Sequence, residues 1–241
     1  MCTVTWWREP AGGDFLVWFN RDERRTRPVS EPVRARAADD GTHFLAPCDP
    51  AAGGTWLLAN EHGLVVGVLN HYGAGVEVIR SATSVHSRGQ LPLRFAACRG
   101  VADVERLAQA IAPEQFAPFI LVAWDPSRCA TWTSNGTRLM AESAPRPPLT
   151  TSSYRSTEVC AWRRQRFAAL AVGGPDSLAT YHGDVAHADP AFNVRMRRSD
   201  ARTESICRVR VTAGEVRFEH RREAPDALAA VDVTEALLPH H

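Results

Sequence analysis

The 241-residue sequence has no long hydrophobic run and no excess of either charge. No stretch approaches the roughly 20 apolar residues of a membrane-spanning helix, so no membrane span is expected. The N-terminus lacks a basic region followed by an apolar run, which argues against a secretory signal and favours a cytoplasmic protein. The formal net charge is +1, from 28 basic and 27 acidic residues. This balance gives no electrostatic case for nucleic acid or an anionic membrane as the main partner.

The sequence also lacks the patterns of a metal site. Its six cysteines are scattered and include no C-x-x-C pair, so most are expected to be reduced and buried. His182 and His187 are too far apart in sequence to share one helical face at i, i+4. We therefore expect neither a metal nor another cofactor.

What the sequence does have is the composition of an ordinary globular protein, with 44% hydrophobic and 23% charged residues. Its length suits one large domain, and no repeat, low-complexity tract or linker divides it, so we expect a single domain over residues 1–241. Short β-prone runs lie early and late in the chain, with helical patterns between them. This order predicts an α+β protein with two antiparallel sheets covered by helices.

Alternating and β-branched runs predict four hairpins, formed by residues 2–7 with 15–19, 55–60 with 64–70, 119–124 with 129–133, and 204–211 with 216–220. Apolar residues at helical spacing predict helices within residues 91–112, with a break near Gly100 and a stop at Pro113, and within residues 157–172. The second helix is expected to turn Val159, Trp162, Phe167, Leu170 and Ala171 toward a core. Polar and glycine-rich composition predicts surface loops over residues 24–40 and 173–189.

Cys2 follows the initiator Met1 directly. Methionine aminopeptidase removes Met1 when the second side chain is small, and this leaves Cys2 with a free α-amine. The pKa of such an amine is about 7.7–8.0, so part of it is neutral at physiological pH and accepts a proton. One residue then supplies both a thiol nucleophile and its base. The alternative is a cysteine at the edge of a first strand, with no catalytic role.

The run Asn20-Arg21-Asp22-Glu23 ends the strand that is expected to pair with the strand of Cys2. An antiparallel partner brings these charges back alongside residue 2. A guanidinium near the sulfur lowers the pKa of the thiol, and a carboxylate can hold the α-ammonium. The alternative is that these charges form a solvated turn.

Three segments, Met1-Cys2-Thr3, Asn20-Arg21-Asp22-Glu23 and Gly54-Thr55-Trp56-Leu57, resemble the NRDE family, also called the transport and Golgi organisation 2 family. The later segments Thr150-Thr151-Ser152-Ser153 and Asp200-Ala201-Arg202-Thr203-Glu204-Ser205 also fit its spacing. The resemblance covers nearly the whole chain and is strongest before Asn70. It implies the four-layer αββα sandwich of N-terminal-nucleophile (Ntn) hydrolases.

A more distant resemblance is to choloylglycine hydrolases and penicillin V acylases, which begin Met-Cys-Thr and contain an N-E-x-G-L…L-N block. Asn60-Glu61-His62-Gly63-Leu64 and Leu69-Asn70 match that block. The resemblance implies that Cys2 attacks an amide carbonyl and that Asn70 donates a hydrogen bond to the oxyanion. Those enzymes place an arginine and an aspartate three residues apart, whereas Arg21 and Asp22 are adjacent here. The remaining expected site residues are Ser152, where those hydrolases have an asparagine, Arg202 as a late active-site arginine, and Asn20, His71 and Tyr72 near the substrate.

Two functions follow from these features. The first is an amidohydrolase acting on a non-peptide C–N bond, or an acyltransferase, that forms an acyl-enzyme on Cys2 with a small-molecule amide or acyl substrate. The second is a non-enzymatic haem-binding protein, a role that the resemblance to the NRDE family implies, with His71, His182 or His187 as axial ligand. The sequence identifies neither the substrate nor the oligomeric state, and a homo-oligomer remains an open alternative.

Overall fold

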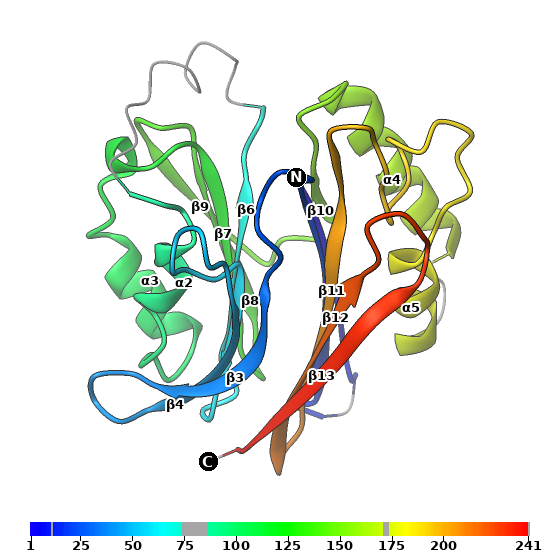
Figure 1. Ribbon diagram of the computed structural model, residues 1–241. Helices are drawn as coiled ribbons and strands as arrows, with labels where there is room; N and C mark the ends of the chain where they lie inside the picture. Colours follow the sequence, from blue (N-terminus) through cyan, green and yellow to red (C-terminus); the bar gives the residue numbers. More distant parts are fainter. Residues whose placement is uncertain (11, 74–85, 171–173, 241) are drawn as a thin grey trace.

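The structure is a computed structural model that describes residues 1–10, 12–73, 86–170 and 174–240. Two antiparallel sheets pack face to face, and helices cover the outer face of each sheet (Figure 1). The layers are therefore helix, sheet, sheet and helix. The predicted α+β class and four-layer αββα sandwich are confirmed.

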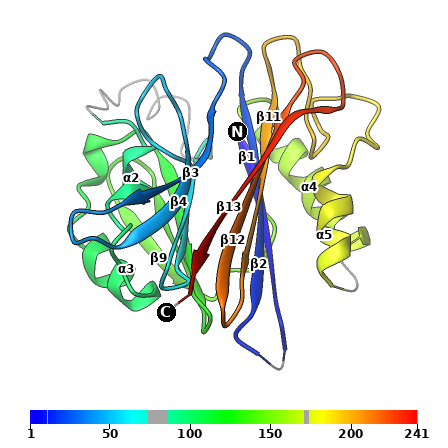
Figure 2. The same ribbon diagram turned by 60° about the horizontal axis from the view of Figure 1, so that its bottom comes forward.

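The first sheet contains both the N-terminal strand and the last strand of the described chain. In spatial order its strands are β10 (Leu149–Thr151), β1 (Cys2–Arg8), β2 (Phe15–Arg24), β11 (Ala201–Val211), β12 (Glu215–Glu223) and β13 (Ala230–Pro239). The second sheet runs β3 (Glu31–Ala37), β4 (His43–Cys48), β5 (Leu57–Asn60), β6 (Val65–Asn70), β7 (Phe119–Trp124), β8 (Cys129–Ser134) and β9 (Leu139–Ser143). At one edge of the sandwich β13 lies against β3 of the other sheet (Figure 2).

The helices divide between the two outer faces. The second sheet is covered by α2 (Gln90–Leu93) and α3 (Val101–Ala108), with the 3₁₀ turn η1 (Pro113–Gln115) after them. The first sheet is covered by α4 (Ser156–Leu170) and α5 (Pro175–His182). A large apolar core that includes Val4, Phe19 and Leu57 lies between the sheets, and a second core lies under α2 and α3.

Side chains alternate between the two faces of β1 and β2, and this alternation positions the site. Cys2, Val4, Phe15, Val17 and Phe19 belong to the core between the sheets. The residues between them point to the helices: Thr5 contacts His182 of α5, and Leu16 and Trp18 pack with Leu178 of α5. Cys2 therefore faces the second sheet and not the helices.

The structure corrects several local predictions. Residues 24–40 do not form a loop throughout, because they contain β3, an exposed edge strand whose Pro32 and arginines obscure the alternation. Residues 173–189 contain α5, which begins at Pro175 and ends before Gly183. The break expected near Gly100 is confirmed, since α2 ends at Leu93 and α3 begins at Val101, directly after Gly100. Strands β4, β9, β10 and β13 were not predicted.

The inward face of α4 also differs from the prediction. Val159 is buried as expected, but the other buried side chains of the helix are Cys160 and Arg163. Trp162, Phe167 and Leu170 are half-buried, and Ala171 lies outside the described residues. A charged residue therefore occupies a position that hydrophobic periodicity assigns to apolar side chains.

Candidate active site

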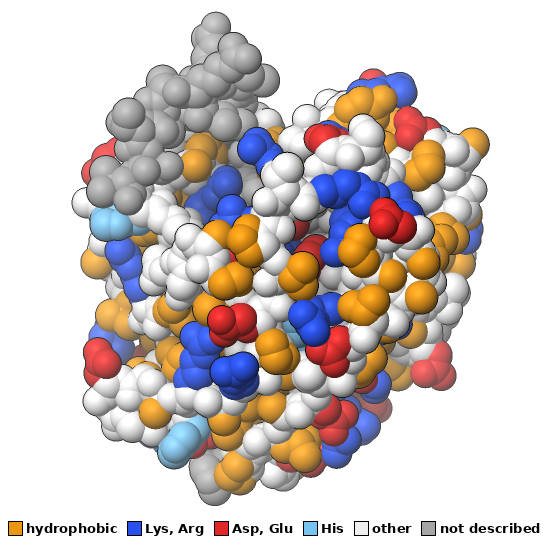
Figure 3. All heavy atoms as spheres, in the orientation of Figure 1, with side chains coloured by type: hydrophobic (Ala, Val, Ile, Leu, Met, Phe, Trp, Pro, Cys, Tyr) orange, Lys and Arg blue, Asp and Glu red, His pale blue; other side chains and the backbone are white. Residues whose placement is uncertain are grey.

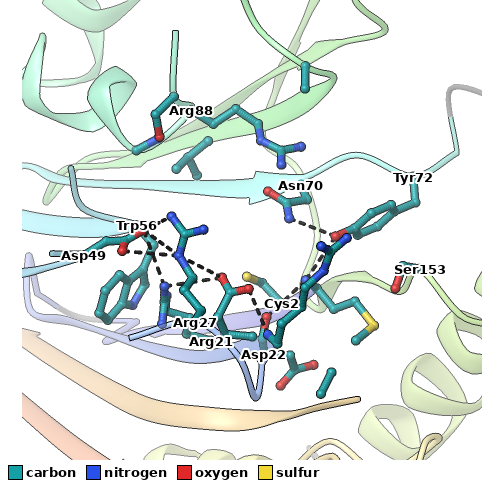
Figure 4. A pocket seen from close by; sticks show the side chains of 18 of the residues that line it. Cys2, Arg21, Asp22, Arg27, Asp49, Trp56, Asn70, Tyr72, Arg88 and Ser153 are labelled. Carbon is teal, nitrogen blue, oxygen red and sulfur yellow. Dashed lines mark hydrogen bonds and ion pairs between the residues drawn. The ribbon is translucent and has the colours of Figure 1, made fainter. Parts of the chain in front are cut away.

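A cavity of about 410 Å³ opens between the two sheets at the end where the chain begins. Figure 3 shows the hollow between the two halves of the molecule, with basic side chains gathered around it. Cys2 and Arg21 line the cavity from the first sheet, and Trp56 and Asn70 line it from the second (Figure 4). Residues far apart in the sequence thus meet at one concave surface.

Cys2 begins β1 and lies between β10 and β2. It is paired with Thr151 on one side and with Arg21 on the other. Its backbone N–H donates to Thr151 Oγ1 at 3.2 Å. The ladder continues to Met1, whose ammonium donates to the Asp22 carbonyl at 3.2 Å while the Asp22 N–H donates to the Met1 carbonyl at 3.0 Å. The neighbouring strands β10 and β2 therefore fix the position of the Cys2 backbone on both sides.

The protonation state of Cys2 differs from the expectation of a lowered pKa. Burial, the largest effect, raises the pKa of the thiol above its ordinary value of 9.0, and the Asp22 carboxylate raises it further. The N-terminal ammonium and Arg21 lower it, but they do not offset the burial. In this state Cys2 is a thiol at neutral pH, so a nucleophilic sulfur requires a base that takes its proton.

Arg21 forms the charged wall of the cavity beside Cys2. Its guanidinium lies 3.0 Å from a carboxylate oxygen of Glu204 and 3.3 Å from one of Glu23, and it stacks over the Trp56 ring at 4.5 Å. Glu204 lies at a β-bulge between Thr203 and Ser205. Such a bulge changes the direction of a side chain locally, and here Glu204 points into the layer between the sheets.

Asp22 points away from Arg21, toward α4. Its carboxylate accepts a hydrogen bond from Thr203 Oγ1 at 2.7 Å and lies 3.4 Å from the guanidinium of Arg163. The side chains of both Asp22 and Arg163 are fully buried. Asp22 reaches the N-terminus through its backbone carbonyl and not through its carboxylate. Sequence reasoning missed Arg163 because an arginine on a helix is ordinarily a solvated residue.

Asn70 ends β6 on the opposite side of the cavity. Its Nδ2 donates to the Tyr72 hydroxyl at 2.8 Å, and that hydroxyl lies 3.4 Å from the Met1 ammonium. The structure thus brings Asn70, Tyr72 and the N-terminus into one polar chain at the cavity wall. The first asparagine of the same block, Asn60, is buried, and its side chain fixes the turn between β5 and β6.

Four predicted site residues lie outside the cavity lining. Asn20 is fully buried, and its Nδ2 donates to the carbonyls of His182 and Val194. Ser152 Oγ donates to the Tyr154 carbonyl at 2.7 Å, and it lies 3.5 Å from Met1 Sδ. The other two are Arg202, which donates to the carbonyl of Glu223 at 2.7 Å beside a separate small depression, and His71, whose Nδ1 hydrogen-bonds with the Ser134 carbonyl.

The histidines considered as haem ligands occupy different settings. His182 is fully buried at the end of α5, with Nε2 2.7 Å from Thr5 Oγ1 and Nδ1 2.7 Å from Asn20 Oδ1. Burial lowers the pKa of His182 to about 3. Both ring nitrogens are engaged, so His182 has no nitrogen to offer to iron. His187 stacks on Phe192 away from the cavity.

Sequence reasoning also missed Arg88, Arg27 and Asp49, which line the cavity. The segment of Arg88 is held against the Gly54-Thr55-Trp56 segment by a hydrogen bond from Thr55 N–H to the Gly89 carbonyl at 2.9 Å. A Cβ at Gly54 would lie 2.5 Å from the Gly89 backbone. Glycine at position 54 therefore permits this close approach, which explains its place in the motif.

In the described part of the chain, no helix is long and apolar enough to cross a membrane. Residues 1–10, 12–73, 86–170 and 174–240 likewise contain no group of three or more histidine, cysteine, aspartate or glutamate side chains with the geometry of a metal site.

Solved structures with the same fold are Ntn hydrolases. Penicillin V acylase from Agrobacterium tumefaciens has a TM-score of 0.53 and 13% identity, over 94% of this chain and 84% of that one. A single-residue variant of conjugated bile acid hydrolase from Clostridium perfringens has a TM-score of 0.56 and 12% identity, over 99% and 96%. The Caenorhabditis elegans ortholog of N-acylethanolamine-hydrolyzing acid amidase has a TM-score of 0.50 and 10% identity, over 86% and 92%. At such identities the likeness establishes the fold alone.

The comparison with curated proteins gives no match. The family model of Transport and Golgi organisation 2 matches residues 1–167, which include Cys2, the Asn20–Glu23 run and Asn70. The β1–β2 and β5–β6 hairpins, which carry Cys2, Arg21 and Asn70, lie within that match. The chain belongs to the Transport and Golgi organisation 2 family and has the fold of the Ntn hydrolases.

Proposed function

We propose that this protein is an Ntn-type cysteine amidohydrolase that cleaves a non-peptide amide after Met1 has been removed. The observation that carries the proposal is the position of Cys2 at the start of β1, inside the cavity and opposite Asn70. Met1 is only 7% exposed, so its removal must precede completion of the fold or be carried out by the site itself.

In the proposed reaction the Cys2 α-amine takes the proton of the thiol, and the sulfur attacks the amide carbon. Because burial raises the pKa of this thiol, the adjacent amine is needed as base. Asn70 Nδ2 donates to the developing oxyanion. The C–N bond then breaks, the leaving amine takes the proton from the α-ammonium, and a thioester remains on Cys2. Water completes hydrolysis, whereas an amine or alcohol in its place would make the reaction an acyl transfer.

Arg21 and Asp22 have supporting roles in this proposal. Arg21 places a positive charge beside the sulfur, which favours the thiolate once its proton has left. Asp22 contributes through its backbone hydrogen bonds with Met1, which hold this end of the β1–β2 hairpin together. The new α-amine is the Cys2 nitrogen, and Thr151 Oγ1, which accepts from it at 3.2 Å, is positioned to hold it after Met1 is lost. The expected substrate is a small acyl compound, since the cavity of about 410 Å³ is of small-molecule size. The family assignment is also compatible with the non-enzymatic alternative, haem binding.

The test combines intact mass with acylation by p-nitrophenyl acetate. We expect a chain without Met1, a burst of p-nitrophenol, and an acetyl group on the peptide that begins with Cys2. Cys2→Ala should abolish the burst, whereas Cys129→Ala should keep it, because Cys129 lies outside the cavity. Inserting one glycine between Met1 and Cys2 keeps the thiol but removes its free amine, and should end turnover. An inert Cys2 in the mature protein would contradict the proposal.

A further inference from the structure

Arg88 lines the cavity and has no role in the reaction described above. Arg88 precedes α2 and reaches into the cavity from the side opposite Arg21 and Arg27, toward Asn70 (Figure 4). Its Nη1 donates to the Pro118 carbonyl at 3.0 Å. This is its one side-chain hydrogen bond to the described residues, and a guanidinium has five N–H donors, so with respect to those residues it keeps donors for the cavity that it lines.

The carboxylates around the cavity are all paired with arginines. Each carboxylate that lines it lies within ion-pair distance of an arginine, in the pairs Asp22–Arg163, Glu23–Arg21, Asp49–Arg27 and Asp200–Arg198. Among the described residues, no carboxylate lies within ion-pair distance of Arg88 or Arg24. Arg24 is exposed to solvent, whereas Arg88 is half-buried. Among the described residues, the unneutralised positive charges inside the cavity are therefore the Arg88 guanidinium and the N-terminal ammonium, and Arg88 is the one that belongs to a side chain.

The position of Arg88 is fixed by its neighbours on both sides. Gly54 and Gly89 approach so closely that a Cβ at Gly54 would meet the Gly89 backbone, and Gln90 Nε2 donates to the Ala52 carbonyl at 2.9 Å. Burial lowers the pKa of the guanidinium, against the opposing fields of Tyr72 and Cys2. A half-buried arginine without a carboxylate costs free energy, and that cost is recovered when an anion binds.

On this basis, which rests on the proposed function for the choice of an acyl compound, we propose that the cavity binds N-acyl compounds carrying a carboxylate or phosphate, and that Arg88 binds that anion. Arg88 and Cys2 line the same cavity, so the anionic group and the acyl carbon belong to one small molecule. The fork of a guanidinium suits both carboxylate and phosphate oxygens. Arg88 is a binding residue here and takes no part in proton transfer.

The test measures binding to the Cys2→Ala variant by isothermal titration calorimetry. The probes are N-hexanoylethanolamine, its phosphate ester N-hexanoylphosphoethanolamine, and N-hexanoylglycine. We expect at least one of the anionic compounds to bind roughly tenfold more tightly than the neutral one, as a charge-assisted hydrogen bond contributes. A preference for the phosphate or for the carboxylate identifies the anion. Because this variant lacks the thiol of residue 2, the outcome is independent of whether Cys2 catalyses anything.

Three further variants, each made in the Cys2→Ala background, test whether Arg88 causes the preference for the anionic probes over the neutral one. Arg88→Met should abolish it, and Arg88→Lys should retain part of it. Arg34→Met removes an exposed arginine of β3 that does not line the cavity, and should leave the preference unchanged. Equal affinity for the neutral and anionic probes, a preference that survives Arg88→Met, or no binding of any probe at millimolar concentration would each overturn the inference.

Discussion

Arg163→Met removes the cation that neutralises Asp22, and we expect it to lower the free energy of unfolding by about 3–5 kcal/mol. Both side chains have 0% exposure, and both terminal guanidinium nitrogens lie 3.4 Å from Asp22 Oδ2. The same guanidinium donates to Thr3 Oγ1 at 3.0 Å and to the Asn193 carbonyl at 2.8 Å. Methionine preserves much of the aliphatic volume, so the loss reports the buried charge and its hydrogen bonds more than a cavity.

The measurement is urea unfolding of Arg163→Met, of Asp22→Asn and of the double variant that combines them. Removing both charges should cost less than the sum of the single changes, with a coupling of about 1–3 kcal/mol. Arg164→Met, at an exposed position of α4, should change stability by less than about 0.5 kcal/mol. An additive cycle, or a cost of Arg163→Met below about 1 kcal/mol, would refute the assignment of a buried ion pair.

The pH dependence gives a second signature. Burial raises the pKa of Asp22 above its ordinary value of 3.8, and the opposing field of Arg163 is the largest effect that lowers it. Without Arg163 the pKa rises further, so the folded variant binds a proton that the unfolded chain releases above pH 3.8. The difference in free energy of unfolding between wild type and Arg163→Met should therefore shrink as the pH falls from about 7 toward about 4.

Three other changes have definite expected outcomes. Asn70→Ala should slow acylation of Cys2 by roughly 10²–10³-fold in burst kinetics. Asn135→Ala, at a half-buried turn position that does not line the cavity, should not slow it, and a slowing by Asn70→Ala of less than about threefold would remove Asn70 from the oxyanion site. His182 has a pKa of about 3 because it is buried, so its contribution to stability is lost as the pH falls from 6.5 toward 3, by up to about 1.4 kcal/mol per pH unit. His182→Gln should flatten this dependence of the free energy of unfolding on pH, as measured by urea titrations at several pH values. Gly54→Ala should cost about 2 kcal/mol or more, because its Cβ would meet the Gly89 backbone at 2.5 Å, whereas Gly214→Ala, with open space around it, should be nearly neutral in thermal unfolding.

The sequence predicted the parts of the fold that short-range patterns determine. The β1–β2 hairpin follows from two β-prone runs around a glycine turn, and the hairpin alone places Cys2 beside Arg21. The same reasoning found β5, β6, β7 and β8, whose apolar runs are bounded by turn residues. It failed at β3, where exposed arginines dominate. It also failed at β13, where the alternation of side chains becomes apparent only from the pairing with β12.

The charged partners of the site were not predictable in the same way. An arginine in a helix or loop has the same local signature whether it is solvated or buried. Arg163 is buried because α4 packs on the first sheet above Asp22, and Arg88 faces the cavity because the second sheet lies opposite the first. Both positions depend on how the helix and sheet layers pack together, which the local sequence around Arg163 or Arg88 does not reveal.

The pleat of β2 explains how the run Asn20-Arg21-Asp22-Glu23 is used in the structure. Side chains of a strand alternate between faces, so the four polar residues divide into two pairs. Asn20 and Asp22 face the helices and hold α5 and α4 through His182 and Arg163. Arg21 and Glu23 face the cavity and interact with each other there. One motif thus joins a stability function to a site function. Substitutions at 20 and 22 should act first on unfolding, and those at 21 and 23 on the chemistry of Cys2.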